Sequence, residues 1–126
     1  MPVVALAVSS ILFGLLHALN PNLTVLGFLN LVLAGVALGV GYWATGSLWL
    51  PIAYHLSWNF VQGSLLGLPV SGVRYGGLLA VADWGKAPRL TGGAFGPEGR
   101  LLATVISSTG YCISPPSTQK PAAPRE

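Results

Sequence analysis

The stretch that decides the fold is residues 1–73, MPVVALAVSSILFGLLHALNPNLTVLGFLNLVLAGVALGVGYWATGSLWLPIAYHLSWNFVQGSLLGLPVSGV. It contains no Asp, Glu, Lys or Arg, because the six basic and three acidic residues of the chain all lie between Arg74 and Glu126. Charged residues make up 7% of the 126-residue chain, against about 25% in a soluble globular domain. A surface that faces water needs such residues, so the charge-free stretch predicts a membrane protein.

Charge and cysteine content exclude other classes of protein. The formal net charge is +3, but six scattered basic residues form no patch of the kind that binds nucleic acid. Cys112 is the single cysteine, so an intrachain disulfide and a thiolate metal cage are both excluded. The first 19 residues lack the basic segment of a signal peptide, and we interpret them as part of the protein.

Three apolar runs are long enough to be predicted as membrane-spanning helices. Eighteen helical residues cover about 27 Å, close to the ~30 Å hydrocarbon core of a bilayer. The predicted spans are residues 2–19, 23–45 and 48–68. Asn20-Pro21-Asn22 and Thr45-Gly46-Ser47 are predicted turns, with a helix cap in the first.

The remaining sequence completes the predicted architecture. Residues 69–100 are rich in Gly and Pro and carry charges, which indicates a loop outside the hydrocarbon. Residues 101–113 form a short fourth apolar helix, and residues 114–126 a disordered tail. The fold class is therefore an all-α polytopic transmembrane bundle in residues 1–113, with three clear spans and a short fourth helix.

Gly35 and Gly39 form a GxxxG pair in the second predicted span. Small residues at this spacing let another helix approach closely in lipid, where no hydrophobic drive brings helices together. We therefore predict that a neighbouring helix packs against this pair.

Two histidines and one asparagine are the candidates for chemistry. His17 follows Phe13 by four residues, and Asn59 follows His55 by four, so each pair shares a helix face. Ionisable residues at membrane depth are costly and mark functional sites, whereas a lone polar residue there more often joins helices through hydrogen bonds. Imidazoles on two helices suit acid–base chemistry, a metal such as zinc, or axial ligation of a haem.

The motifs Phe13-x-x-x-His17 and Leu48-Trp-Leu-Pro-Ile leading into His55-x-x-x-Asn59 resemble the second and third motifs of the CPBP intramembrane proteases. This family comprises CAAX-processing and bacteriocin-related Abi enzymes. The glycine-rich segment 90–99 resembles the stretch before the last helix of many bacterial members. The resemblance covers about residues 9–105.

This resemblance implies peptide-bond hydrolysis at the membrane, on a membrane-associated peptide or protein substrate. His17, His55 and Asn59 would be the catalytic residues, with Phe13 as motif support. His55 and Asn59 would stabilise the oxyanion, or His17 and His55 would bind a divalent metal such as zinc. The implied location is the bacterial plasma membrane, with lipid as the surrounding partner.

The chain departs from the family pattern because it has no Glu-Glu-x-x-x-Arg motif, which supplies the base in that family. Its acids are Asp83, Glu98 and Glu126, all after the charge-free stretch. We therefore expect an N-terminally truncated chain that cannot hydrolyse peptides alone, or a non-catalytic protein that binds peptides or acts in bacteriocin self-immunity. We interpret Glu98 as a structural residue of a turn before the last helix, with a role as substitute acid as the alternative.

The predicted positions of the histidines raise a geometric question. In straight spans His17 and His55 would differ in depth by about 15 Å at 1.5 Å per residue. A shared site therefore requires strongly tilted helices, or a turn after His17 that lies at membrane depth and lines a cavity.

Overall fold

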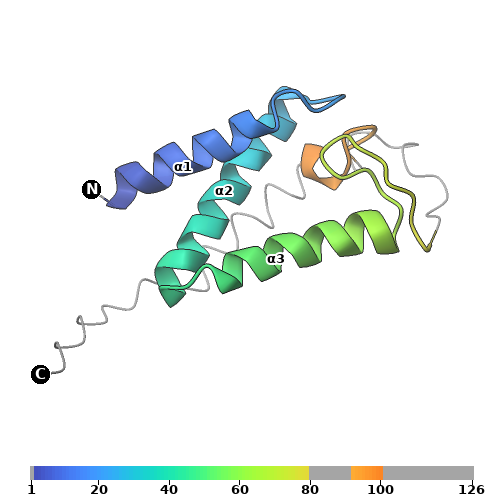
Figure 1. The fold of residues 1–126 in the computed structure, drawn as a ribbon. Helices are drawn as coiled ribbons and strands as arrows, with labels where there is room; N and C mark the ends of the chain where they lie inside the picture. The colour runs from blue at the N-terminus through green and yellow to red at the C-terminus, as the bar shows by residue number, and fades with distance from the viewer. Residues whose placement is uncertain (1, 80–91, 101–126) are drawn as a thin grey trace, which may run out of the picture.

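The computed structural model describes residues 2–79 and 92–100 of the chain. Three α-helices follow a zigzag path, with α2 running diagonally between α1 and α3 (Figure 1). The elements in chain order are α1 (Pro2–Leu16), α2 (Val25–Thr45), α3 (Trp49–Asn59), the π-helix η1 (Phe60–Leu65) and the 3₁₀ turn η2 (Pro97–Gly99). The predicted all-helical class is confirmed for these residues, whose one β feature is an isolated Val70–Val73 bridge.

The prediction of three clear membrane spans is wrong. α2 has 21 residues and a mean hydropathy of 2.0, and it is the one described helix long and apolar enough to cross a bilayer. α1 has 15 residues and α3 has 11, which at 1.5 Å per residue reach only about 22 and 16 Å. The predicted fourth helix, 101–113, and the predicted tail lie outside the described residues.

Local hydrogen bonds explain why the helices are shorter than the apolar runs. After Leu16 the backbone tightens into turns, in which the N–H of His17 donates to Gly14 and the N–H of Asn20 donates to His17. The cap of α2 is Thr24, whose hydroxyl accepts from the Gly27 N–H at 3.0 Å, and not a residue of the Asn-Pro-Asn turn as predicted. Apolarity alone does not reveal where such turns begin.

The predicted packing against the GxxxG pair is confirmed, and the neighbour is α1. A Cβ atom at Gly35 would lie 2.9 Å from the Ser10 Cα atom, and one at Gly39 would meet the Leu6 side chain. α1 and α2 therefore pack against each other at this pair. Large apolar side chains on the other face of α1 are exposed, Val8 and Leu15 among them, as expected for a surface in contact with lipid.

Replacement of Gly35 by Ala is expected to destabilise the chain, although alanine is the better helix former. The added methyl would press on the Ser10 backbone, which cannot move aside, and such overpacking costs about 1–3 kcal/mol. The matched control is Gly41→Ala in the same helix, where the new methyl would meet Leu50 at an ordinary 3.7 Å. The stability of both variants is measured by unfolding in mixed micelles, followed by circular dichroism. A Gly35→Ala variant more stable than Gly41→Ala would contradict the packing of α1 on Gly35.

The segments after α3 fold back against the helices. α3 passes directly into η1, and the chain then returns through Pro69, which is fully buried. Phe95 is 1% exposed and contacts Gly27 of α2, while its carbonyl accepts from the Gly72 N–H at 2.7 Å. The described parts of the predicted loop therefore close one side of the helical zigzag, where η2 lies between α2 and α3 (Figure 1).

Candidate active site

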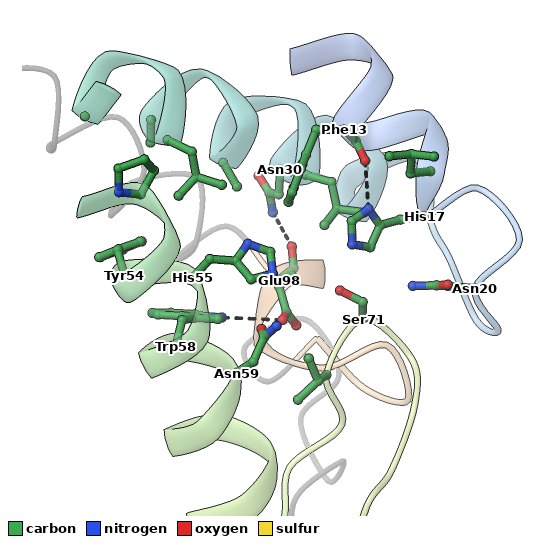
Figure 2. Close-up of a pocket in the computed structure, with 18 of the residues that line it drawn as sticks. Phe13, His17, Asn20, Asn30, Tyr54, His55, Trp58, Asn59, Ser71 and Glu98 are labelled. Carbon is green, nitrogen blue, oxygen red and sulfur yellow. Dashed lines mark hydrogen bonds between the residues drawn. The ribbon is translucent and has the colours of Figure 1, made fainter. Parts of the chain in front are cut away.

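A cavity of about 670 Å³ lies between the three helices and the returning segments. Its wall includes the sequence-predicted residues Phe13 and His17 from α1 and the turn after it, and His55 and Asn59 from α3 (Figure 2). The structure therefore gathers all of the predicted site residues around one cavity.

His17 is oriented by its own helix. Its Nδ1 atom lies 2.7 Å from the Phe13 carbonyl oxygen, which can only accept a hydrogen bond. Nδ1 therefore donates, and in the neutral imidazole this leaves Nε2 as the acceptor. The helical four-residue spacing of Phe13 and His17 thus fixes the tautomer that a proton acceptor requires.

The aromatic ring of Phe13 links the two histidines. Its centroid lies 4.8 Å from the His17 ring and 5.5 Å from the His55 ring. The two imidazoles are thus at most about 10 Å apart, which is the sum of these distances. The depth problem of straight helices is resolved by the diagonal course of α2 and by the turn after α1, which lines the cavity through Asn20.

His55 and Asn59 lie on the cavity side of α3 and are partly buried, whereas Ser57 between them is exposed. The same helical face continues through Trp58 and, in η1, through the buried Gln62. This face therefore presents an imidazole, two amides and an indole N–H, which are hydrogen-bond donors of the kind that stabilise a developing oxyanion.

Glu98 is the residue whose place the sequence did not reveal. It stands in η2, 39 residues after Asn59 in the chain, yet it lines the same cavity (Figure 2). Its carboxylate accepts from the Gln62 Nε2 atom at 2.9 Å to each oxygen, and from the Trp58 indole at 3.4 Å. The predicted turn is present, but the carboxylate is directed at the face of α3 and η1.

Asn30 of α2 holds the backbone of this turn. Its Nδ2 atom donates to the Glu98 carbonyl at 2.6 Å and to the Arg100 carbonyl at 2.9 Å, and the residue is 3% exposed. Sequence reasoning passed over Asn30 and Gln62. The available signal was their rarity as amides in a charge-free apolar stretch, and for Gln62 its position three residues after Asn59.

Burial raises the pKa of the Glu98 carboxyl above its ordinary value of 4.5. Hydrogen bonds from Gln62, from Trp58 and from the backbone of Ser71 act in the opposite direction, but burial is the larger effect. A carboxyl with a raised pKa is a stronger base when ionised and releases its proton less readily when protonated. This is the behaviour of a general acid–base group.

The side chains around the cavity do not form a complete metal site. A protein-bound zinc ion takes three or four protein ligands at about 2.0–2.3 Å. Within residues 2–79 and 92–100, no group of three or more His, Cys, Asp and Glu side chains is placed to hold an ion together. His17 and His55 would be two ligands without a third, so no chemical step is assigned to a metal.

Comparison with known proteins identifies a family that resembles the first half of the chain. Residues 1–61 match the family model described as type II CAAX prenyl endopeptidase Rce1-like. No curated protein and no solved structure matches the chain. The matched residues include both histidines and Asn59, and confirm the resemblance stated from their motifs. Residues 1–61 therefore match the Rce1-like CAAX prenyl endopeptidases, a family of intramembrane proteases.

Proposed function

We propose that the cavity is the active site of a CAAX-type endopeptidase that cleaves peptide bonds of a membrane-associated substrate. The observation that carries this proposal is the gathering of His17, His55 and Asn59 around one cavity, from separate helices of a family-matched segment. A shared packing role would not require the three side chains to face a common space of about 670 Å³.

Each of these groups has a role in hydrolysis that its geometry supports. Peptide hydrolysis needs a proton acceptor, an oriented water and donors aimed at the carbonyl oxygen that becomes charged. His17 presents Nε2 as an acceptor because Nδ1 is occupied by the Phe13 carbonyl. His55 and Asn59 carry N–H groups and serve as the oxyanion donors.

The remaining wall of the cavity suits an apolar substrate group. On the α2 side it is lined by aliphatic side chains and glycine, with Leu50 at the start of α3: Leu31, Ala34, Ala37, Leu38, Val40, Gly41 and Leu50. A prenyl chain or an apolar peptide side chain is stabilised there by about 25 cal/mol per Å² of buried surface. Peptide and apolar group are then held in one cavity, beside the polar residues.

The test uses the purified full chain in lipid nanodiscs and a farnesylated peptide that ends in Cys, two aliphatic residues and Met. Mass spectrometry is expected to show loss of the C-terminal residues with the wild type and no detectable loss with His17→Ala. Cleavage that survives in His17→Ala contradicts the proposed site.

Binding measured in parallel separates the remaining outcomes. A wild type that binds the farnesylated peptide but leaves it intact supports the non-catalytic alternative, in which the chain recognises peptides or takes part in bacteriocin self-immunity. A wild type that neither binds nor cleaves contradicts both functions. An unprenylated peptide of the same sequence is the control for the contribution of the apolar group.

A further inference from the structure

Glu98 reaches the cavity from a segment that lies far along the sequence from the other site residues. Phe95 anchors the segment in the core, and Asn30 holds the backbone on both sides of Gly99 through the carbonyls of Glu98 and Arg100. These contacts join α2 to residues 68 and 70 positions later in the sequence. The turn is thus placed by tertiary contacts against the cavity.

The carboxylate of Glu98 is fixed on the helical face that carries the predicted catalytic residues. Trp58, which precedes Asn59, donates to one oxygen, and Gln62 donates to both. Gln62 lies in η1, and single π-helical turns that continue an α-helix occur frequently at functional sites. His55, Asn59 and the Glu98 carboxylate are consequently presented to the same cavity wall.

The surroundings of the Glu98 side chain are built for a carboxylate. The Gln62 amide, the Trp58 indole and the Ser71 backbone all donate to it. A carboxylate accepts through both oxygens, whereas a glutamine would turn an NH₂ donor toward one of these donors. Among the described residues, the Gln62 Oε1 atom is also buried without a hydrogen-bond partner, because the Gln62 amide turns its donors to Glu98 and Pro69. Both oxygens of the Glu98 carboxylate therefore accept hydrogen bonds, whereas the Oε1 atom of Gln62 accepts none among the described residues.

We propose that Glu98 is the catalytic carboxylate of this site and activates the attacking water. The proposal rests on the endopeptidase function proposed above. It places a carboxylate at the cavity that holds the two histidines.

The step balances with one water consumed for each peptide bond. The attacking water is oriented by the Nε2 acceptor of His17, and Glu98 takes the proton from this water. The water oxygen bonds to the scissile carbonyl carbon, and the π electron pair moves onto the carbonyl oxygen beside His55 and Asn59. Glu98 then passes its proton to the amide nitrogen, the C–N bond breaks with its electron pair on nitrogen, and the carbonyl re-forms. The products are a carboxylic acid and an amine, and Glu98 is again ionised.

The test compares Glu98→Gln with the wild type on the farnesylated peptide in nanodiscs. We expect kcat to fall at least a hundredfold while peptide binding stays within about twofold, because loss of a general base costs 10²–10⁴ in rate. Glu126→Gln is the matched control, since it makes the same chemical change at the last residue of the sequence. Its kcat is expected to equal that of the wild type.

A pH profile distinguishes a base from a structural acid. Activity of the wild type should rise with pH as Glu98 ionises, in a range above 4.5 because burial raises its pKa. Other titratable or charged groups facing the cavity or next to Glu98 are His17, His55, Tyr54, Tyr75 and Arg100. The residual activity of Glu98→Gln should lack the rise with pH that comes from ionisation of Glu98. A rise that disappears in this variant is therefore assigned to Glu98.

Folding is checked by thermal unfolding, and Glu98→Asp serves as a second variant if the glutamine variant does not fold. Asp keeps the acid but withdraws it by one methylene, and a folded Glu98→Asp slowed tenfold or more supports the proposal. Folded variants that cleave at the wild-type rate overturn it, and so does a wild type that binds the peptide without cleaving it. The proposed function fails instead where the wild type cleaves and His17→Ala cleaves equally well.

Discussion

Replacement of His55 by Ala is expected to lower kcat for the farnesylated peptide by about a hundredfold to a thousandfold. This is the range observed when one donor to an oxyanion is removed from a hydrolase site. His55 is partly buried at the cavity and its ring packs edge-on against Phe13, so its position is preorganised before substrate binds. A preorganised donor stabilises the transition state without a reorganisation cost, and its loss appears in kcat.

The matched control for this prediction is Ser57→Ala. Ser57 lies two residues from His55 in the same helix but is exposed and does not line the cavity. Its replacement should leave kcat unchanged, and Asn59→Ala should resemble His55→Ala because both face the cavity. Equal activity of His55→Ala and Ser57→Ala would remove His55 from the site.

The largest effect on stability is expected from Gly72→Ala. Gly72 has a φ of 86°, and a Cβ atom there would clash with the Pro21 carbonyl oxygen and lie 3.4 Å from the Phe95 ring. Alanine in this left-handed conformation costs about 1–2 kcal/mol, and the overlap with Pro21 adds roughly 1–3 kcal/mol. The segment would be displaced from Phe95, and with it the adjacent cavity residues Ser71 and Val73.

Gly76→Ala separates the two contributions. Gly76 has a similar φ of 74°, but apart from its chain neighbours no atom of residues 2–79 and 92–100 lies within 4 Å of the position where its Cβ would stand. Gly76→Ala should therefore lose only the free energy that alanine costs in the left-handed conformation. Unfolding in mixed micelles by circular dichroism is therefore expected to rank wild type above Gly76→Ala, and Gly76→Ala above Gly72→Ala. Equal stability of the two variants would mean that the contact between Gly72 and Pro21 does not support the fold.

Local spacing explains why part of the candidate site was predictable. Phe13 with His17, and His55 with Asn59, are four residues apart on helices, so each pair shares a face whatever the rest of the chain does. The GxxxG pair of α2 was predictable for the same reason, because it needs only some close neighbour. Spacing did not reveal that the two histidine helices meet, since this depends on the course of α2.

Helix ends were less predictable than helix faces. Residues 17–19 and 60–65 continue the apolar runs that contain α1 and α3, yet the first leave the α-helix for turns and the second form a π-helix. Hydropathy reports the preferred solvent of a segment and not its hydrogen-bond pattern. Three apolar runs therefore became one helix long enough to span a bilayer and two shorter ones.

The sequence by itself determined the apolar, all-helical character of this protein, its family motifs, and the His17, His55 and Asn59 candidates. These depend on composition and on spacing within single helices. Tertiary structure alone decided that Glu98 joins them, because Asn30, Trp58 and Gln62 reach it across 36 to 68 residues of chain. Contacts over such separations follow from the packing of the whole chain, which no local pattern encodes.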